Sequence, residues 1–185
     1  MRCAVAVAPV RAEPDDAAEQ VTQALEGEPL RVEERSRGWA RVVTAYDYPG
    51  WIREEALEEG EGSLPPQTEG TPVEVARRYL GTPYLWGGMT EAGIDCSGLV
   101  HMAYRRLGRI VPRDADQQED AATEVEELRP GDLITYADPG EVADHIAFWL
   151  GDGRILHSTS RDGLGVNEEV EPESLRARRR KLIRL

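Results

Sequence analysis

The feature that most constrains this fold is a cysteine placed directly before a run of apolar residues with helical spacing. The apolar side chains after Cys96 recur three and four residues apart, which is the pattern of one buried helix face. They are Leu99, Val100, Ala103, Tyr104 and Leu107. The pattern predicts a helix over residues 96–107 with Asp95 or a neighbour as its N-cap. Cys96 then lies in the first turn, where we expect the N–H groups of the helix end to lower the pKa of its thiol.

Length and charge exclude several classes of protein. A chain of 185 residues, of which 40% are hydrophobic, suits one folded domain or two small ones. Its formal net charge of -13 disfavours nucleic acid and anionic membranes as partners. No apolar run is long enough to span a membrane, and the first residues make a poor secretion signal. We therefore expect a cytoplasmic monomer, although a chain trimmed of a leader would show the same pattern.

Turn-forming and charged residues divide the chain into two parts. Residues 1–60 contain short β-patterned segments separated by turns, which predicts a small β-barrel. Within this part, residues 12–25 have some helical character, which predicts a loop or a turn of helix there. Residues 61–70 are rich in glycine, proline and glutamate, which is typical of a linker. Residues 71–185 form the second predicted domain.

The second domain mixes helix and strand patterns, which indicates an α+β fold. Thr71 is a suitable N-cap and Pro72 a suitable first residue for a helix that runs to about Leu80. The segment 111–118 is predicted to be a loop. The other predicted elements are strands at 133–136, 144–150 and 154–160, and a helical turn followed by a strand over 172–185.

Two of the three histidines lie on adjacent predicted strands. His145 and His157 flank the segment Gly151-Asp152-Gly153. If these three residues form the hairpin loop, Ala147 faces His157 and His145 faces Thr159. The two histidines are then diagonal neighbours on one face of the sheet, within reach of each other's rings. A shift of one residue would place them on opposite faces, so the loop length decides whether they meet.

One cysteine and two histidines brought together in this way predict nucleophilic catalysis. Cys96 would attack, His145 would take its proton and later protonate the leaving amine, and His157 would orient the ring of His145. The backbone N–H of Cys96 and the hydroxyl of Tyr84 are the candidate oxyanion donors. His101 points away from the thiol on the same helix and is predicted to be an ordinary helix residue. A zinc site is the rival, since this ligand set also binds zinc, but a cysteine at a helix start favours the nucleophile.

Six short motifs follow one another along the second part of the chain. They are Pro83-Tyr84-Leu85-Trp86-Gly87-Gly88, Asp95-Cys96-Ser97-Gly98-Leu99-Val100, Pro112-Arg113-Asp114, Gly131-Asp132-Leu133, Asp144-His145-Ile146-Ala147 and His157-Ser158. In this order they closely resemble the NlpC-type cysteine peptidases, which cleave peptidoglycan stem peptides on a papain-like α+β fold. The resemblance covers most of residues 72–185. It implies a triad of Cys96, His145 and His157, with Tyr84 near the oxyanion and no metal or organic cofactor.

The first part resembles the bacterial SH3-like domain that one subgroup joins to this peptidase. That subgroup is the γ-D-glutamyl-L-diamino acid endopeptidases, also called dipeptidyl-peptidase VI. The resemblance implies that Glu19, Tyr48 and Asp95 bind the free amine of an N-terminal L-Ala. It also implies further substrate contacts from Ser97, Trp86, Arg113 and Asp114. Some members have serine where this chain has Ala115, so backbone N–H groups, Ser97 or Arg113 would have to bind the D-Glu carboxylate instead.

The function that the resemblance implies is hydrolysis of the bond between γ-D-Glu and meso-diaminopimelate or L-Lys. The substrates would be peptidoglycan-derived peptides with a free L-Ala amine, as in murein peptide recycling. Three alternatives stay open: a secreted endopeptidase that acts on intact wall, a wall-binding module with a degenerate peptidase, and a transacylase at the same site. A thiol probe that failed to label Cys96 would favour the binding module.

Overall fold

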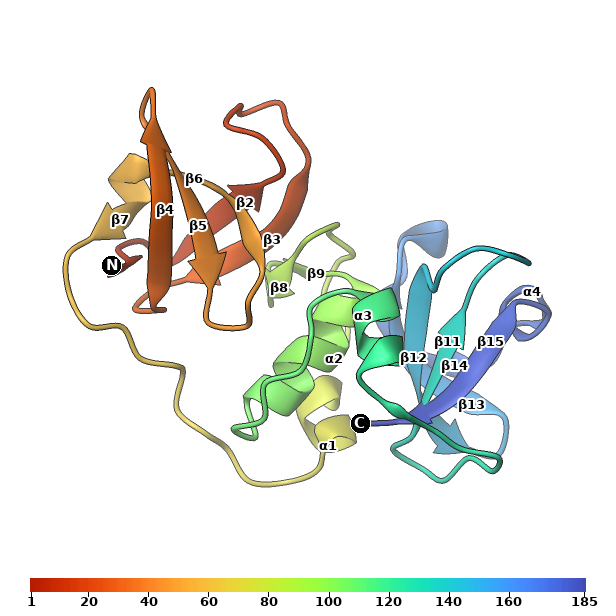
Figure 1. Cartoon of the computed structure of the whole chain (residues 1–185). Helices are drawn as coiled ribbons and strands as arrows, with labels where there is room; N and C mark the ends of the chain where they lie inside the picture. The colour runs from red at the N-terminus through yellow and green to blue at the C-terminus, as the bar shows by residue number, and fades with distance from the viewer. The chain divides into compact units, whose positions relative to one another are not determined.

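The computed structural model describes residues 1–185 as two compact units, 1–66 and 67–185 (Figure 1). The boundary between the units falls inside the segment that the sequence predicts to be a linker. Each unit has a sheet of its own. No helix in the chain has the length and apolar character needed to cross a membrane.

The first unit is a small antiparallel β-structure, as predicted. Its five-stranded sheet has the order β3-β2-β6-β5-β4, and a short pair joins β1 to β7. The strands are β1 (Arg2–Cys3), β2 (Val7–Arg11), β3 (Gln20–Leu25), β4 (Leu30–Ser36), β5 (Trp39–Thr44), β6 (Pro49–Arg53) and β7 (Leu57–Glu58), with the 3₁₀ turn η1 (Glu54–Ala56) before β7. The alternating inward residues, among them Val10, Val42 and Ile52, form one apolar core.

Of the loop or helical turn predicted within residues 12–25, residues 12–19 form a loop, and no helix forms. Residues 20–25 form β3, which pairs with β2 so that Val10 lies opposite Thr22. The side chains of Thr22 and Ala24 are buried by this pairing. A neighbouring strand with an apolar face therefore overrides the modest helix propensity of the segment.

The second unit packs short helices beside a six-stranded antiparallel sheet with the order β10-β15-β11-β12-β13-β14 (Figure 1). Its helices and 3₁₀ turn are α1 (Pro72–Arg77), α2 (Cys96–Arg105), α3 (Ala115–Asp120), η2 (Arg161–Gly163) and α4 (Glu173–Arg176). Its strands are β8 (Met89–Thr90), β9 (Gly93–Ile94), β10 (Thr123–Glu124), β11 (Leu133–Tyr136), β12 (His145–Gly151), β13 (Arg154–Thr159), β14 (Gly165–Val170) and β15 (Arg179–Arg184). Helix α2 packs against β12 and β13, and α1 packs against α2.

The helix starts follow from local chemistry. Thr71 and Glu74 form a reciprocal capping box at the start of α1, and Pro72 occupies the first helical position. Asp95 caps α2 by accepting a hydrogen bond from the backbone N–H of Gly98 at 2.6 Å. These caps confirm the predicted starts of both helices, whereas α2 ends at Arg105, slightly before the predicted end.

Besides the two-residue strands β8, β9 and β10, which were not predicted, two longer elements depart from the sequence predictions. The predicted loop at 111–118 instead begins α3 at Ala115. The buried face of α3 carries the polar residues Gln118 and Glu119, so it lacks an apolar helical pattern. Strand β14 was not predicted, because polar residues occupy its centre and its pairing with β13 comes from the tertiary fold.

The β12–β13 hairpin has the predicted register but not the predicted loop. Phe148 lies opposite Leu156, and Trp149 lies opposite Ile155. The turn itself is the pair Asp152–Gly153, whose φ angles of 49° and 74° are typical of a type I′ turn. Gly151, which the sequence places in the loop, instead pairs with Arg154, and Leu150 before it forms a bulge. The bulge absorbs that residue, so the strands beyond it keep the register that brings the histidines together.

Candidate active site

Cys96 is the first residue of α2 and is buried against β12. The backbone N–H of Ile146, the residue after His145, donates a hydrogen bond to the Cys96 sulfur, as does the N–H of Ser97. The side chain of Ser158 on β13 donates to the carbonyl of Ile94 at 2.7 Å, close to the start of the helix. The thiol therefore lies between the start of α2 and the strands that carry the two histidines.

The expectation of a lowered thiol pKa is wrong. Burial, and next the carboxylate of Asp95, raise the pKa of Cys96 to about 12. The N–H groups of Ile146 and Ser97 and the charge of Arg113 act in the opposite direction, but more weakly. A helix N-terminus thus does not compensate for desolvation here. The resting thiol is protonated at neutral pH and needs a base to become a nucleophile.

His145 and His157 form a direct hydrogen bond between their rings. Nε2 of His145 lies 2.8 Å from Nδ1 of His157, and the two ring planes are nearly perpendicular. His157 is fully buried, and the ring of Tyr136 on β11 packs against His145. Burial lowers the pKa of both histidines, so both are neutral at neutral pH. Nδ1 of His145 is the ring nitrogen that this contact leaves for another partner.

The raised pKa of Cys96 and the lowered pKa of His145 predict an unusual pH profile for the alkylation of Cys96. A neutral thiol beside a neutral imidazole gives little thiolate near pH 7, so the rate with iodoacetamide should still rise above about pH 9. Peptide mapping by mass spectrometry would follow the Cys96 adduct separately from Cys3. A plateau below about pH 7 that the His145→Ala variant abolishes would instead indicate a preformed thiolate–imidazolium pair.

Tyr84 and Trp86 lie with His145 around a cleft of about 400 Å³. Burial, and next the charges of Cys96 and Asp95, raise the pKa of Tyr84, so its hydroxyl remains a hydrogen-bond donor. Trp86 is exposed and lines the cleft. Arg161 also lines the cleft. The cleft therefore combines a donor, an aromatic surface and a cation beside the histidine.

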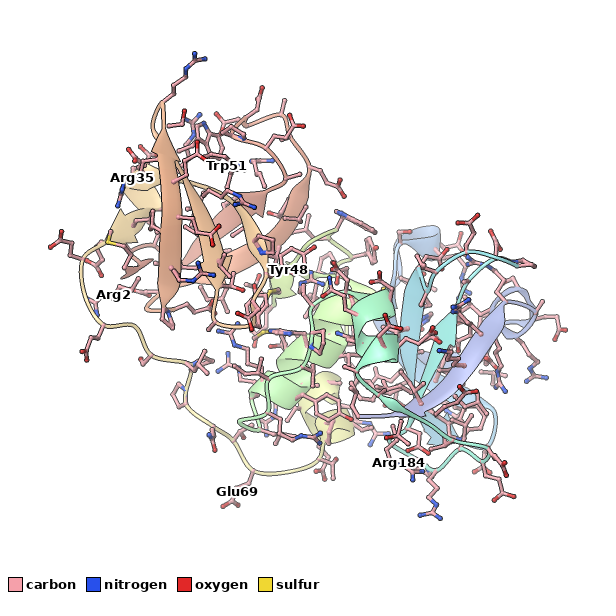
Figure 2. The ribbon with its side chains drawn as sticks, in the orientation of Figure 1. Arg2, Arg35, Tyr48, Trp51, Glu69 and Arg184 are labelled. Carbon is pink, nitrogen blue, oxygen red and sulfur yellow. The ribbon has the colours of Figure 1, made fainter.

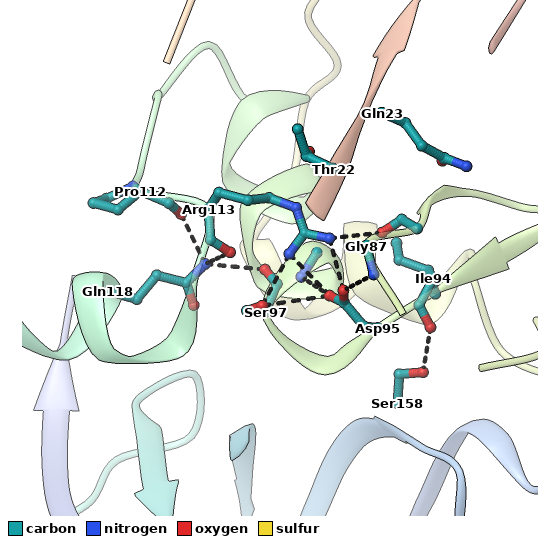
Figure 3. A network of polar contacts seen from close by, with 12 residues as sticks. Thr22, Gln23, Gly87, Ile94, Asp95, Ser97, Pro112, Arg113, Gln118 and Ser158 are labelled. Carbon is teal, nitrogen blue, oxygen red and sulfur yellow. Dashed lines mark hydrogen bonds and ion pairs between the residues drawn. The ribbon is translucent and has the colours of Figure 1, made fainter. Parts of the chain in front are cut away.

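Asp95 and Arg113 form a buried ion pair at the start of α2 (Figure 3). Arg113 Nη2 donates to Asp95 Oδ2 at 2.7 Å, and Nη1 donates to Oδ1 at 3.0 Å. The same carboxylate accepts from the N–H groups of Gly87 and Gly98. The Asp95 carboxylate therefore binds three parts of the site at once: the loop that contains Gly87, the first turn of α2, and Arg113. Its predicted contact with a substrate amine stays a prediction.

The other residues of this cluster tie the segment 112–114 to α2. Arg113 Nη1 donates to Ser97 Oγ at 2.9 Å, and Gln118 donates to the carbonyls of Ser97 and Pro112. Asp114 is the residue directly before α3. Ser97 and Arg113 thus lie at the start of α2, and the substrate contacts of Ser97, Arg113 and Asp114 stay predictions.

Gly98 fits where a side chain would not. A Cβ atom at this position would lie 2.4 Å from the carbonyl oxygen of Gly88 and 2.8 Å from Asp95 Oδ1. Atoms this close would have to move apart. The glycine therefore allows the Gly88 loop to approach the first turn of α2, next to Cys96.

Glu19 and Tyr48 belong to the first unit. Glu19 is exposed and directly precedes β3. Tyr48 is half-buried directly before β6, with its backbone N–H bonded to Thr44 Oγ1 at 3.1 Å (Figure 2). Their predicted role in binding an amine together with Asp95 stays a prediction.

One residue of the site was missed by the sequence predictions. Glu169 on β14 lies with Oε1 2.9 Å from Nε2 of His157, and Arg161 donates to both of its carboxylate oxygens. The polar sequence of β14 has no apolar alternation to identify it as a strand. A prediction of that strand and of its register with β13 could have found Glu169.

The zinc alternative finds no support in this geometry. Each histidine uses one ring nitrogen to contact the other, so these two nitrogens do not point toward a common ion. No group of three or more His, Cys, Asp or Glu side chains is arranged to hold a metal ion.

Family comparisons divide the chain in the same way as its two units. Residues 81–178 match the NlpC/P60 family, and residues 10–57 match the family described as the bacterial dipeptidyl-peptidase Sh3 domain. A crystal structure of an NlpC/P60 family protein from Bacillus cereus is similar over 99% of this chain and 62% of that one, with a TM-score of 0.59. At 23% identity, this similarity supports the fold.

Two curated relatives are γ-D-glutamyl-L-lysine dipeptidyl-peptidases. The protein from Bacillus cereus is 32% identical over 124 residues, which cover 64% of this chain and 37% of the relative. The protein from Bacillus subtilis is 30% identical over 131 residues, which cover 67% of this chain and 42% of the relative. The matched part of the chain thus spans less than half the length of either relative.

Proposed function

The chain belongs to the NlpC/P60 family, and from this premise we propose that it is a cysteine peptidase acting on peptidoglycan-derived peptides. The observation that carries the proposal is the hydrogen bond between His145 and His157 beside the buried thiol of Cys96. This arrangement provides a nucleophile, a base with a free ring nitrogen and a residue that orients the base.

The reaction we propose proceeds through an acyl-enzyme. His145 Nδ1 takes the thiol proton while the sulfur of Cys96 attacks the scissile carbonyl carbon. The backbone N–H of Cys96 and the hydroxyl of Tyr84 donate hydrogen bonds to the oxyanion that forms. His145 then returns the proton to the leaving amine as the C–N bond breaks. Water, deprotonated by His145, attacks the resulting thioester, releasing the acid and restoring the thiol.

For the substrate, we propose stem peptides that begin with L-Ala-γ-D-Glu and have a free amine. The bond cleaved joins γ-D-Glu to L-Lys or meso-diaminopimelate. Two observations support this choice: the names of the two curated relatives, and the match of residues 10–57 to a dipeptidyl-peptidase domain. Glu19, Tyr48 and Asp95 would bind the amine, because an ammonium group needs a carboxylate or an aromatic face when it leaves water. Recycling of released peptides in the cytoplasm is the setting we propose.

Mass spectrometry of defined peptides tests this proposal. L-Ala-γ-D-Glu-L-Lys and its diaminopimelate counterpart are incubated with the protein, beside the same peptides acetylated on the L-Ala amine. We expect cleavage of the free-amine peptides alone, and a Glu19→Gln, Tyr48→Leu variant that cleaves them more slowly, because it lacks both the carboxylate and the aromatic face. Equal cleavage of both forms would contradict the amine pocket and favour an endopeptidase that acts on intact wall. Cleavage of neither form would contradict the proposed substrate class.

A further inference from the structure

A chain of polar contacts extends beyond the two histidines to β14. His157 uses Nδ1 to contact Nε2 of His145 at 2.8 Å, and Nε2 to contact Oε1 of Glu169 at 2.9 Å. Both ring nitrogens of His157 are therefore engaged, one by a ring and the other by a carboxylate. The side chain of His157 is fully buried at the centre of this chain of contacts, whereas Glu169 at its end is partly exposed.

Strand pairing gives Glu169 a defined position in this chain of contacts. Residue His157 lies opposite Asn167, and Ile155 lies opposite Glu169, in the β13–β14 register. Glu169 is therefore the diagonal neighbour of His157 on the same face of the sheet. Arg161 Nη2 donates to its two oxygens at 2.6 and 2.5 Å, so the carboxylate is held from a second side.

The direction of these hydrogen bonds determines where the protons lie. An ionised carboxylate only accepts, so Nε2 of His157 must carry the proton of that hydrogen bond. Nδ1 of a neutral His157 is then an acceptor, and Nε2 of His145 must donate to it. This leaves Nδ1 of His145 unprotonated and able to act as a base.

We propose that Glu169 is a positioning residue that fixes the tautomers of both histidines and so makes Nδ1 of His145 the base for Cys96. This inference rests on the proposed peptidase function and adds Glu169 to the three residues that the sequence predicts. Arg161 supports it by holding the carboxylate in one orientation.

Glu169 also has an electrostatic role when the base becomes charged. A proton taken from Cys96 places a positive charge on the histidine pair, and the carboxylate of Glu169 stabilises that charge. The other groups that face the pair come from four elements. They are Cys96 at the start of α2, Tyr136 on β11, Arg161 in η2 and Arg178 after α4. Both arginines disfavour a protonated, positively charged histidine pair. Glu169 is the anion on β14 that favours the protonated pair.

Three variants of the full chain test the role of Glu169 in catalysis. Glu169→Leu removes the acceptor, and we expect kcat to fall about 10- to 100-fold with little change in KM. Glu169→Gln keeps an oxygen that can accept from His157 but loses the charge, so its kcat should lie between the wild-type and leucine values. Glu168→Gln is the matched control, because Glu168 pairs with Arg77 and Arg154 and not with the histidines. It should behave as wild type.

Nitrogen-15 NMR of the histidine rings provides a test that needs no substrate. We expect wild-type His145 and His157 both to be protonated on Nε2, and the Glu169→Leu variant to show mixed tautomers while its circular dichroism remains native. Unchanged tautomers and unchanged kcat in that variant would overturn the inference. If the wild type cleaves no peptide, the proposed function fails, whereas the NMR result still decides whether Glu169 sets the tautomers.

Discussion

Replacement of Cys96 by alanine should reduce hydrolysis of the free-amine peptides by about 10⁴-fold or more. The variant lacks the atom that forms the thioester, and the cleft retains only binding and oxyanion donors. Initial rates followed by mass spectrometry would measure the loss. Because Cys96 and His145 act as one unit, a Cys96→Ala, His145→Ala double variant should be no slower than either single variant.

Cys3 provides the matched control for this experiment. It is the other cysteine of the chain, lies buried in the first unit and donates through its thiol to the carbonyl of Val5. A Cys3→Ala variant should keep the wild-type rate. If Cys96→Ala retained hydrolysis, or if Cys3→Ala lost it while folded, Cys96 would not be the nucleophile.

Replacement of Arg113 by methionine should lower the free energy of unfolding of the second unit by about 3–5 kcal/mol. The side chains of Arg113 and Asp95 are 1% and 7% exposed, so the variant leaves a carboxylate buried without its main cation. Urea denaturation monitored by circular dichroism would measure the change. The start of α2, which carries Cys96, is the region we expect to lose order first.

Two further variants test whether the unpaired charge of Asp95, rather than the loss of any arginine, destabilises the second unit. Arg77→Met removes an exposed ion pair with Glu168 and should cost about 1 kcal/mol or less. Asp95→Asn combined with Arg113→Met removes the orphaned charge but keeps an N-cap, so the double variant should be more stable than Arg113→Met alone. A double variant that is less stable would show that the buried charge is not the cause.

Local patterns were sufficient for much of the scaffold and for part of the site. Asp95 and Thr71 cap the helices that they were predicted to start, because a cap depends on residues three or four positions apart. The alternation along β12 and β13 predicted that His145 and His157 would be neighbours, and their rings are in hydrogen-bond contact. The hairpin reached this register through a two-residue turn and a bulge, which the loop composition alone did not distinguish from a three-residue loop.

The sequence by itself determined the local features of the site: the helix start at Cys96 and the strand alternation that brings His145 and His157 together. Only the tertiary structure decided the pKa values of those residues and the further side chains that contact them. Burial of Cys96 against β12 raises its pKa although it lies at a helix start, because desolvation depends on what packs around the thiol. Glu169 enters the site through the pairing of β13 with β14, and its strand has no apolar pattern of its own. Contacts between distant segments and the exclusion of water are set by the whole fold, and therefore a local pattern does not contain them.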